Sequence, residues 1–125
     1  MNCASPGDTL RRMSQVNTDR NFISLLRGRT ARIWDGLLLS CGGNDLIEAL
    51  QARGAGIPQA QRLLLERAEW GPPSDGPARY LSDSGWKTFQ GYFQANLVHL
   101  IELRDRGPSK NCPVFFHGYA VPTPR

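Results

Sequence analysis

The sequence predicts an α/β fold built on a parallel sheet. Two short apolar segments, Leu37–Ser40 and Val114–His117, are bounded by turn-forming residues and are typical of buried strands. Between them, the segment from Trp86 to Arg104 repeats apolar residues every three or four positions, which is the period of a helix. A strand, intervening helices and a second strand together predict a right-handed crossover in a parallel sheet.

Two short helices are expected before the first strand. Leu10, Met13 and Val16 form a brief amphipathic pattern after Thr9. Residues 21–27 contain four apolar side chains and are followed by a glycine at position 28, which favours the end of a helix.

A third helix is expected to follow the first strand. The consecutive glycines Gly42 and Gly43 allow a sharp turn after that strand, and Asp45 is a favourable residue at a helix N-terminus. The glycines and proline of residues 53–58 predict the end of this helix.

Beyond that point the sequence predicts a helix, a loop and a longer helix. Residues 60–70 are expected to be helical with Leu63–Leu65 packed inward, and the proline-rich residues 71–77 are expected to form an extended surface loop without regular hydrogen bonding. Ser84 is the expected cap of the longest helix, and Gly107-Pro108 is its expected end. Residues 71–77 are short for a linker, so residues 1–125 are interpreted as one domain.

Composition and charge argue against a nucleic-acid-binding protein. The 125 residues carry a net charge of +4, with a pI near 9.3, but the arginines are scattered and no basic run interleaves with aromatic residues. No signal peptide and no membrane span is recognised, so a cytoplasmic location is the default expectation. The three cysteines form no Cys-x-x-Cys pair, and the two histidines are far apart, so neither a metal nor another cofactor is expected.

One motif indicates a function. The run Gly42-Gly43-Asn44-Asp45 follows a strand and resembles the third sequence block, Gly-x-Asn-Asp, of the SGNH (GDSL-type) hydrolases. Residues 2–10 resemble the second block of that family, and residues 113–119 resemble the next core strand with the His-Gly-Tyr exit of some bacterial members. The resemblance covers nearly the whole chain.

The resemblance implies a partial flavodoxin-like three-layer fold with a parallel sheet, in which esters are cleaved by a Ser-His-Asp arrangement. Gly7 and Asn44 would contribute a backbone N–H and a side-chain amide to the oxyanion hole. Gly43, His117 and Tyr119 would line the substrate site. The full-length parent would hydrolyse a small-molecule or lipid ester without a cofactor.

The chain lacks the first and the last sequence blocks of the family. It contains no Gly-Asp-Ser, the nearest string being Gly7-Asp8-Thr9, and no Asp is followed three residues later by His. The sequence therefore resembles a middle fragment of an esterase or lipase, expected to be inactive alone and to aggregate or be poorly stable through an exposed strand edge. Asp45 is expected to be structural, His99 a surface residue, and His117 a pocket residue rather than the catalytic base.

Two alternatives remain open. The chain could be a non-catalytic binding or interaction protein that retains an α/β scaffold. It could also be an anion-binding protein that uses the Gly42-Gly43 turn and the following helix N-terminus, although no Gly-Lys-Ser/Thr follows as in a P-loop.

Overall fold

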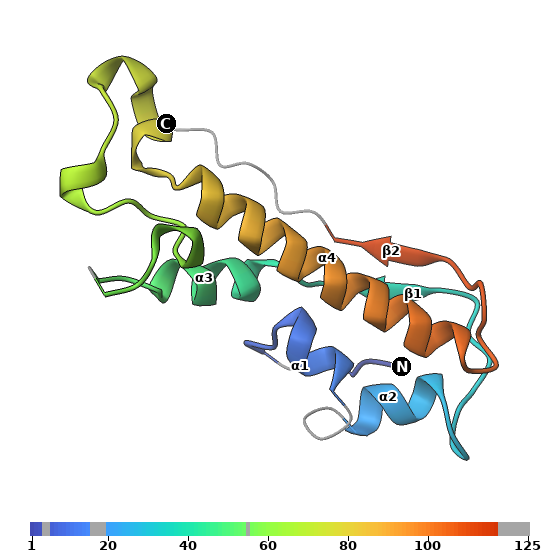
Figure 1. Ribbon diagram of the computed structural model, residues 1–125. Helices are drawn as coiled ribbons and strands as arrows, with labels where there is room; N and C mark the ends of the chain where they lie inside the picture. Colours follow the sequence, from blue (N-terminus) through green and yellow to red (C-terminus); the bar gives the residue numbers. More distant parts are fainter. Residues whose placement is uncertain (4–5, 16–19, 55, 118–125) are drawn as a thin grey trace. The chain divides into compact units, whose positions relative to one another are not determined.

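The computed structural model describes residues 1–3, 6–15, 20–54 and 56–117 (Figure 1). Two compact units divide the chain. Unit 1 contains residues 1–44 and 96–125, and unit 2 contains residues 45–95. Helices α3 and α4 each contribute residues to both units.

Unit 1 contains a parallel sheet of two strands, β1 (Leu37–Leu39) and β2 (Val114–Phe116) (Figure 1). Leu37 is opposite Val114 in the register and Leu39 is opposite Phe116. Parallel strands require a crossover between them, and α4 (Asp83–Asp105) lies in the intervening chain. The α/β class with parallel strands is therefore confirmed, and both strands end one residue before the predicted positions.

One face of this sheet packs on the core of unit 1. Leu26, Leu37 and Cys112 are buried together, and Phe22, Trp34 and Val114 pack against them. The polar atoms at this core are paired, because the Trp34 indole N–H donates to the Leu25 carbonyl at 3.1 Å and the Trp34 backbone N–H donates to the Ser109 hydroxyl at 2.9 Å. Such pairing removes the cost of burying polar groups.

The helices before the sheet follow the sequence pattern. Helix α1 (Leu10–Ser14) is capped by Thr9, whose hydroxyl accepts from the Arg12 N–H at 3.4 Å. Helix α2 (Arg20–Leu26) is followed by Gly28, which has φ +94°, a conformation that favours glycine.

Helices α3 (Gly43–Gln51) and α4 begin at positions different from those predicted. Helix α3 starts at Gly43 rather than near Asp45, so Asn44 lies in its first turn. Ser82, not Ser84, caps α4, because the buried Ser82 hydroxyl accepts from the Gly85 N–H at 2.9 Å.

The prediction of a helix over residues 60–70 is wrong. Two short 3₁₀ helices, η1 (Gln59–Gln61) and η2 (Arg67–Glu69), flank an extended stretch. Leu64 forms an antiparallel bridge with Leu81, and the Leu65 N–H donates to the Tyr80 carbonyl at 2.9 Å. This nonlocal pairing takes the backbone groups that a helix would have used.

Residues 71–77 are also more regular than predicted. A third 3₁₀ helix, η3 (Pro73–Tyr80), is interrupted at Gly76, which has φ 56° and ψ −137°. The rings of Trp70 and Tyr80 meet edge to face at 4.9 Å between centroids, and the Arg79 guanidinium lies 5.8 Å and 5.3 Å from their respective centroids.

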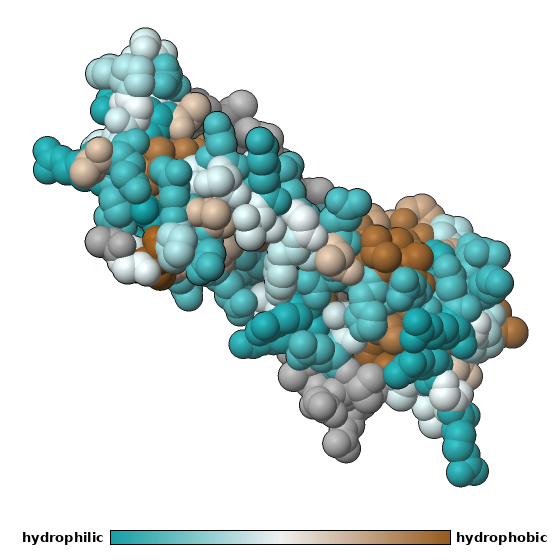
Figure 2. Space-filling view, viewed as in Figure 1, coloured by the Kyte–Doolittle hydropathy of each residue, from teal (hydrophilic) through white to brown (hydrophobic). Residues whose placement is uncertain are grey.

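The second face of the sheet differs from the prediction of buried strands. Leu38 and Phe115, which stand on that face, are 78% and 57% exposed, and Phe116, which stands on the other face opposite Leu39, is 47% exposed. Figure 2 shows hydrophobic surface where β2 lies in Figure 1. Parallel strands are normally covered on both faces, so this face is unusual. In the part of the chain that the structure describes, no helix has the length and apolarity that crossing a membrane requires.

Candidate functional site

Gly43, Asn44 and His117, three of the residues predicted to carry function, follow the carboxyl ends of the two strands in unit 1. The chain leaves β1 through Ser40 and enters α3 at Gly43. At the same edge, the His117 N–H donates to the Leu39 carbonyl at 2.9 Å and extends the ladder beyond β2. In open α/β sheets this edge is where ligands bind.

Asn44 connects this edge to the N-terminal segment. Its side-chain Nδ2 donates to the Asp8 backbone carbonyl at 3.0 Å, across 36 positions of sequence. The two segments predicted to form the oxyanion hole are thus in direct contact, because Asp8 is the residue after Gly7. An amide nitrogen has two hydrogens, so this bond orients the Asn44 amide and leaves its second N–H for another acceptor.

Gly7 has a left-handed backbone conformation and open space beside it. Its φ of +82° is in the left-handed region, and nothing lies within 4 Å of the position where a Cβ would stand. The Gly7 N–H has no acceptor among the described residues. An exposed N–H without an acceptor is suited to a ligand oxygen.

Gly43 and Asn44 form the start of α3 and add further donors. The first N–H groups of a helix have no acceptor within the helix and face its positive end. Asp45 is only 4% exposed, in agreement with the structural role expected of it.

The remaining predicted site residues are not all placed. His117 is exposed at the end of β2, at the same sheet edge as Ser40, while Tyr119 lies outside the described residues. His99 is exposed on α4, as expected of a surface residue. Cys3, Cys41 and Cys112 form no disulfide bond. Cys112 is buried beside the core, as expected of a small apolar side chain, whereas Cys3 and Cys41 are only half-buried.

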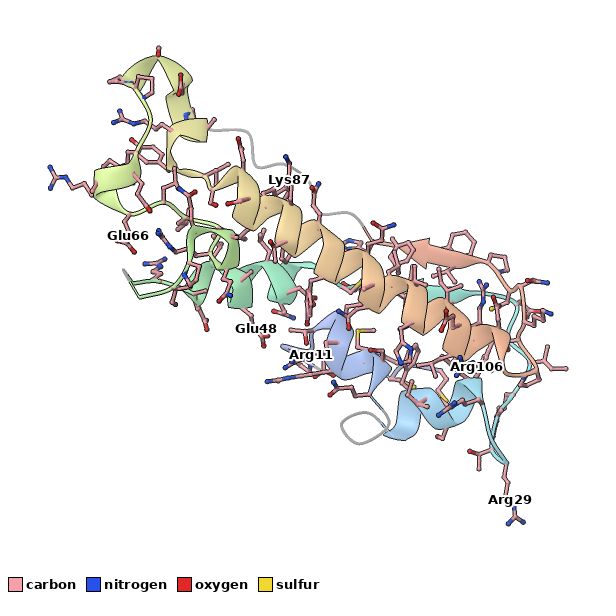
Figure 3. All side chains as sticks on the ribbon, in the orientation of Figure 1. Arg11, Arg29, Glu48, Glu66, Lys87 and Arg106 are labelled. Carbon is pink, nitrogen blue, oxygen red and sulfur yellow. The ribbon has the colours of Figure 1, made fainter. Side chains whose placement is uncertain are left out.

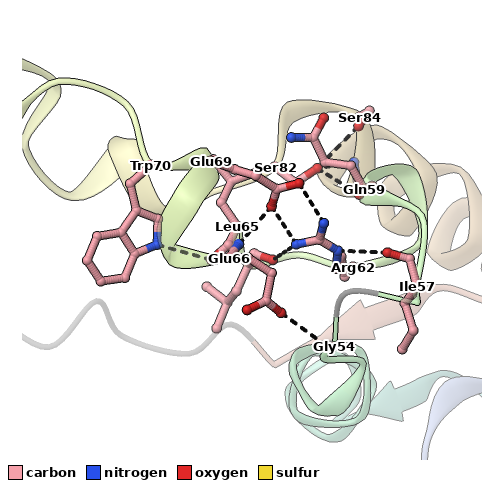
Figure 4. A network of polar contacts seen from close by, with 12 residues as sticks. Gly54, Ile57, Gln59, Arg62, Leu65, Glu66, Glu69, Trp70, Ser82 and Ser84 are labelled. Atoms are coloured by element: carbon pink, nitrogen blue, oxygen red, sulfur yellow. Dashed lines mark hydrogen bonds and ion pairs between the residues drawn. The ribbon is translucent and has the colours of Figure 1, made fainter.

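A polar network in unit 2 was not anticipated from the sequence (Figure 4). Arg62 is 4% exposed and makes a bidentate ion pair with Glu69, with both nitrogen–oxygen distances 2.7 Å. Its Nε donates to the Ile57 carbonyl at 2.9 Å, and the Glu66 N–H donates to Glu69 at 2.8 Å. The hydrogen bond from Arg62, helped by that from the Glu66 N–H, holds the pKa of the Glu69 carboxyl below its usual value.

The network fixes the irregular backbone of Gly54 and residues 56–82. Glu66 accepts the Gly54 N–H at 3.1 Å, and the Ser82 hydroxyl donates to the Gln59 carbonyl at 2.9 Å. The sequence does contain one signal of it: Glu66 and Glu69 have the spacing of a capping box, and they form one at η2. The Arg62 guanidinium and the Glu69 carboxylate bond to each other and to backbone groups of the same unit, which indicates a structural role.

A second ion pair, between Arg104 and Asp105, lies at the end of α4 and contacts the loop that leads to β2 in unit 1. Arg104 Nε is 2.7 Å from Asp105 Oδ1, and its Nη1 donates to the Cys112 carbonyl at 2.7 Å. The hydrogen bond from Arg104, with one from the Asn111 N–H, holds the pKa of the Asp105 carboxyl below its usual value. Asn111 itself has φ 64°, which asparagine tolerates better than most residues.

Charged groups do not define a second site. Within the described residues, His, Cys, Asp and Glu side chains form no group of three that could hold a metal ion. The labelled side chains Arg11 and Arg29 project from different elements of unit 1, one from α1 and one from the loop after α2 (Figure 3).

Comparison with known proteins adds no further constraint: no protein-family model, no curated protein and no solved structure matches the chain.

Proposed function

We propose that this chain carries part of the oxyanion hole of an SGNH-type esterase or lipase domain with a flavodoxin-like, three-layer α/β fold. The observation that supports this most is the hydrogen bond from Asn44 Nδ2 to the Asp8 carbonyl. It joins the segment resembling the second block of the family to the segment resembling the third. The parallel register of β1 and β2 agrees with the resemblance, because the family motif follows a strand of a parallel sheet.

The chemistry follows from the donors available in this part of the chain. Attack on an ester carbonyl creates an oxyanion, and donors that are already oriented stabilise it without reorganising during the reaction. Asn44 supplies a neutral amide whose orientation is set by Asp8, and Gly7, an exposed residue, supplies a backbone N–H. Neither group titrates near neutral pH, so their donor capacity does not vary there.

These donors stabilise an oxyanion but do not form an acyl-enzyme. The sequence has no Gly-Asp-Ser and no Asp-x-x-His, so the serine and the Asp-His pair of the family have no counterpart here. Binding of a tetrahedral anion is therefore the property to measure on this chain, rather than turnover.

The test is a titration of ¹⁵N-labelled protein with a phosphonate monoester that carries a short alkyl chain. We expect the Gly7 backbone resonance and the Asn44 side-chain amide resonances to move together and to report one dissociation constant. Asn44→Ala removes one hydrogen bond to an anion, worth about 1.5 kcal/mol, and is expected to weaken binding about tenfold. Gln51→Ala is the matched control, because Gln51 is an exposed carboxamide at the other end of α3.

Two results would contradict the proposal. One is a titration that moves neither resonance, or an Asn44→Ala variant in which the Gly7 backbone resonance reports an unchanged dissociation constant. The other is inorganic phosphate binding as tightly as the alkyl phosphonate, which would favour the general anion site over an ester site.

A further inference from the structure

Two loops of unit 1 lie side by side at the amino ends of β1 and β2. One loop, residues 27–34, leads toward β1, and the other, residues 106–113, leads into β2. The buried Ser109 hydroxyl joins them, because it donates to the Arg32 carbonyl at 2.9 Å and accepts from the Trp34 N–H at 2.9 Å. The two loops therefore form one surface, at the end of the sheet opposite to the candidate site.

This surface is basic. Its cations are Arg27, Arg29, Arg32, Arg106 and Lys110, and all of them except Arg27 are exposed. Arg106 lies 3.6 Å from Glu102 in an exposed ion pair, a kind of pair that contributes little, and the other four make no ion pair among the described residues. Asp35, which is also exposed, offsets one of these charges.

The positive charge of the chain belongs to unit 1. Residues 1–44 and 96–125 contain ten of the 15 Lys and Arg residues but only five of the 11 Asp and Glu residues. Figure 3 shows Arg29 and Arg106 apart from each other. The cations are thus spread over the surface, which suits an extended anionic partner better than a single anion.

An exposed apolar side chain lies among these cations. Ile33 is 79% exposed, and its position is set by the backbone on either side of it. The Arg32 N–H donates to the Leu25 carbonyl at 3.1 Å, and the Trp34 indole N–H donates to the same carbonyl at 3.1 Å. Arginines around an outward apolar side chain are typical of surfaces that bind at the headgroup level of a bilayer.

We propose that this surface binds an anionic membrane, with Ile33 inserted among the lipid headgroups and the surrounding arginines contacting their phosphate and carboxylate groups. Charge complementarity supports this partner, because basic residues are attracted to the negative surface potential of anionic lipids. Ile33 favours a bilayer over a nucleic acid, since single-stranded nucleic acids stack on exposed aromatic rings, and Trp34 is half-buried.

This inference goes beyond the proposed function and does not depend on it. The basic surface precedes both strands, whereas Asn44 follows the carboxyl end of β1. Asn44→Ala is therefore expected to bind a membrane as the wild-type chain does, so either proposal can fail without the other.

Cosedimentation with sucrose-loaded vesicles tests the charge contribution. The chain is expected to bind vesicles of phosphatidylcholine and phosphatidylserine in equal parts, more weakly as salt is raised, and not to bind phosphatidylcholine alone. Each basic residue near such a bilayer strengthens binding about fivefold, so the double variant Arg29→Gln with Arg32→Gln should weaken it about 25-fold. Arg11→Gln with Arg67→Gln is the charge-matched control, because both are exposed outside the two loops, and it should change binding less than about twofold.

A second pair of measurements tests the insertion of Ile33. Ile33→Ser is expected to weaken binding to the anionic vesicles about tenfold, whereas Ile47→Ser, at a position 56% exposed on α3, should not. In protein labelled at the isoleucine δ1-methyl groups, anionic bicelles with a lipid spin-labelled in its acyl chain should broaden the Ile33 signal and leave the Ile47 signal sharp.

Three results would overturn the proposal. The first is a wild-type chain that binds no vesicles, or binds neutral and anionic vesicles alike. The second is an Arg29 and Arg32 double variant that binds like its control, or an Ile33 methyl signal that the spin label does not broaden. The third is a single-stranded RNA that binds as tightly as the vesicles and is unaffected by Ile33→Ser, which would indicate a nucleic-acid surface. Circular dichroism of each variant excludes unfolding as the cause of lost binding.

Discussion

Replacing Gly85 and Gly91 with alanine, one at a time, is expected to change the free energy of unfolding in opposite directions. Both glycines lie in α4 and within unit 2, so the two variants report on the same helix and the same unit. A Cβ on Gly85 would stand 1.9 Å from the Arg62 carbonyl oxygen and 2.7 Å from its carbon. A Cβ on Gly91 would meet nothing within 4 Å.

The magnitudes follow from these distances. At Gly91, alanine stabilises a helix interior by about 0.5 to 1 kcal/mol, because it restricts the unfolded chain more than glycine does. At Gly85, backbone must move, and overpacking of this kind costs about 1 to 3 kcal/mol. Arg62 cannot shift cheaply, because its guanidinium is tied to Glu69 and to the Ile57 carbonyl.

Thermal unfolding followed by circular dichroism measures the difference. The two variants should differ by about 1.5 to 4 kcal/mol, which corresponds to roughly 6 to 16 °C in Tm at about 4 °C per kcal/mol for a chain of this size. A Gly85→Ala protein that melts at or above the wild-type temperature would refute the close packing of α4 on residue 62. A Gly91→Ala protein that is strongly destabilised would show that this face of α4 is covered.

Three further predictions concern the ion pair, the turn before β2 and catalysis. Glu69 has a lowered pKa, so its carboxylate adds stability above about pH 4.3 that is lost as the pH falls through the lowered value; Glu69→Gln should flatten the acid limb of Tm against pH. Asn111→Val should lower the free energy of unfolding by about 1 to 2 kcal/mol in a urea titration, because a β-branched residue is strained at φ 64°, whereas Asn111→Gly should not. Turnover of a p-nitrophenyl ester should equal that of buffer, and turnover that Asn44→Ala abolishes would contradict the absence of a nucleophile.

Short sequence patterns correctly predicted the helices and strands whose signal lies within a few neighbouring residues. The apolar runs at Leu37–Leu39 and Val114–Phe116 and the helical period of α4 are complete within short windows, and all three are present. Gly28 ended α2 as expected because its left-handed conformation is a property of one residue.

Unit 2 could not be predicted because long-range contacts decide it. The leucines at positions 63–65 suggested a helix, but Leu64 pairs with Leu81 and the preceding Arg62 is held by Glu69. These pairings join residues that are far apart or lie outside any repeating pattern, so the spacing of apolar residues in the sequence cannot predict them. The cap of α4 was misplaced for the same reason, since Ser82 is buried against Gln59 while Ser84 is exposed.

Part of the candidate site could be predicted and part could not. The motif identified Asn44 and Gly7 as partners across the chain, and the structure brings Asn44 to the residue after Gly7. The hydrogen bond from Asn44 to the Asp8 carbonyl was not predicted, because every residue has a backbone carbonyl and the sequence does not show which one accepts. The exposure of Leu38 was missed because a continuous apolar run suits a strand covered on both faces.

Sequencing the DNA on both sides of this reading frame tests the proposed function most directly. The account predicts an in-frame Gly-Asp-Ser upstream, after an apolar strand, and an Asp-x-x-His downstream. Those blocks would supply the nucleophile and the Asp-His pair that complete the donors at Gly7 and Asn44. Stop codons at both ends, or flanking sequence without these blocks, would contradict the esterase assignment and favour a binding protein.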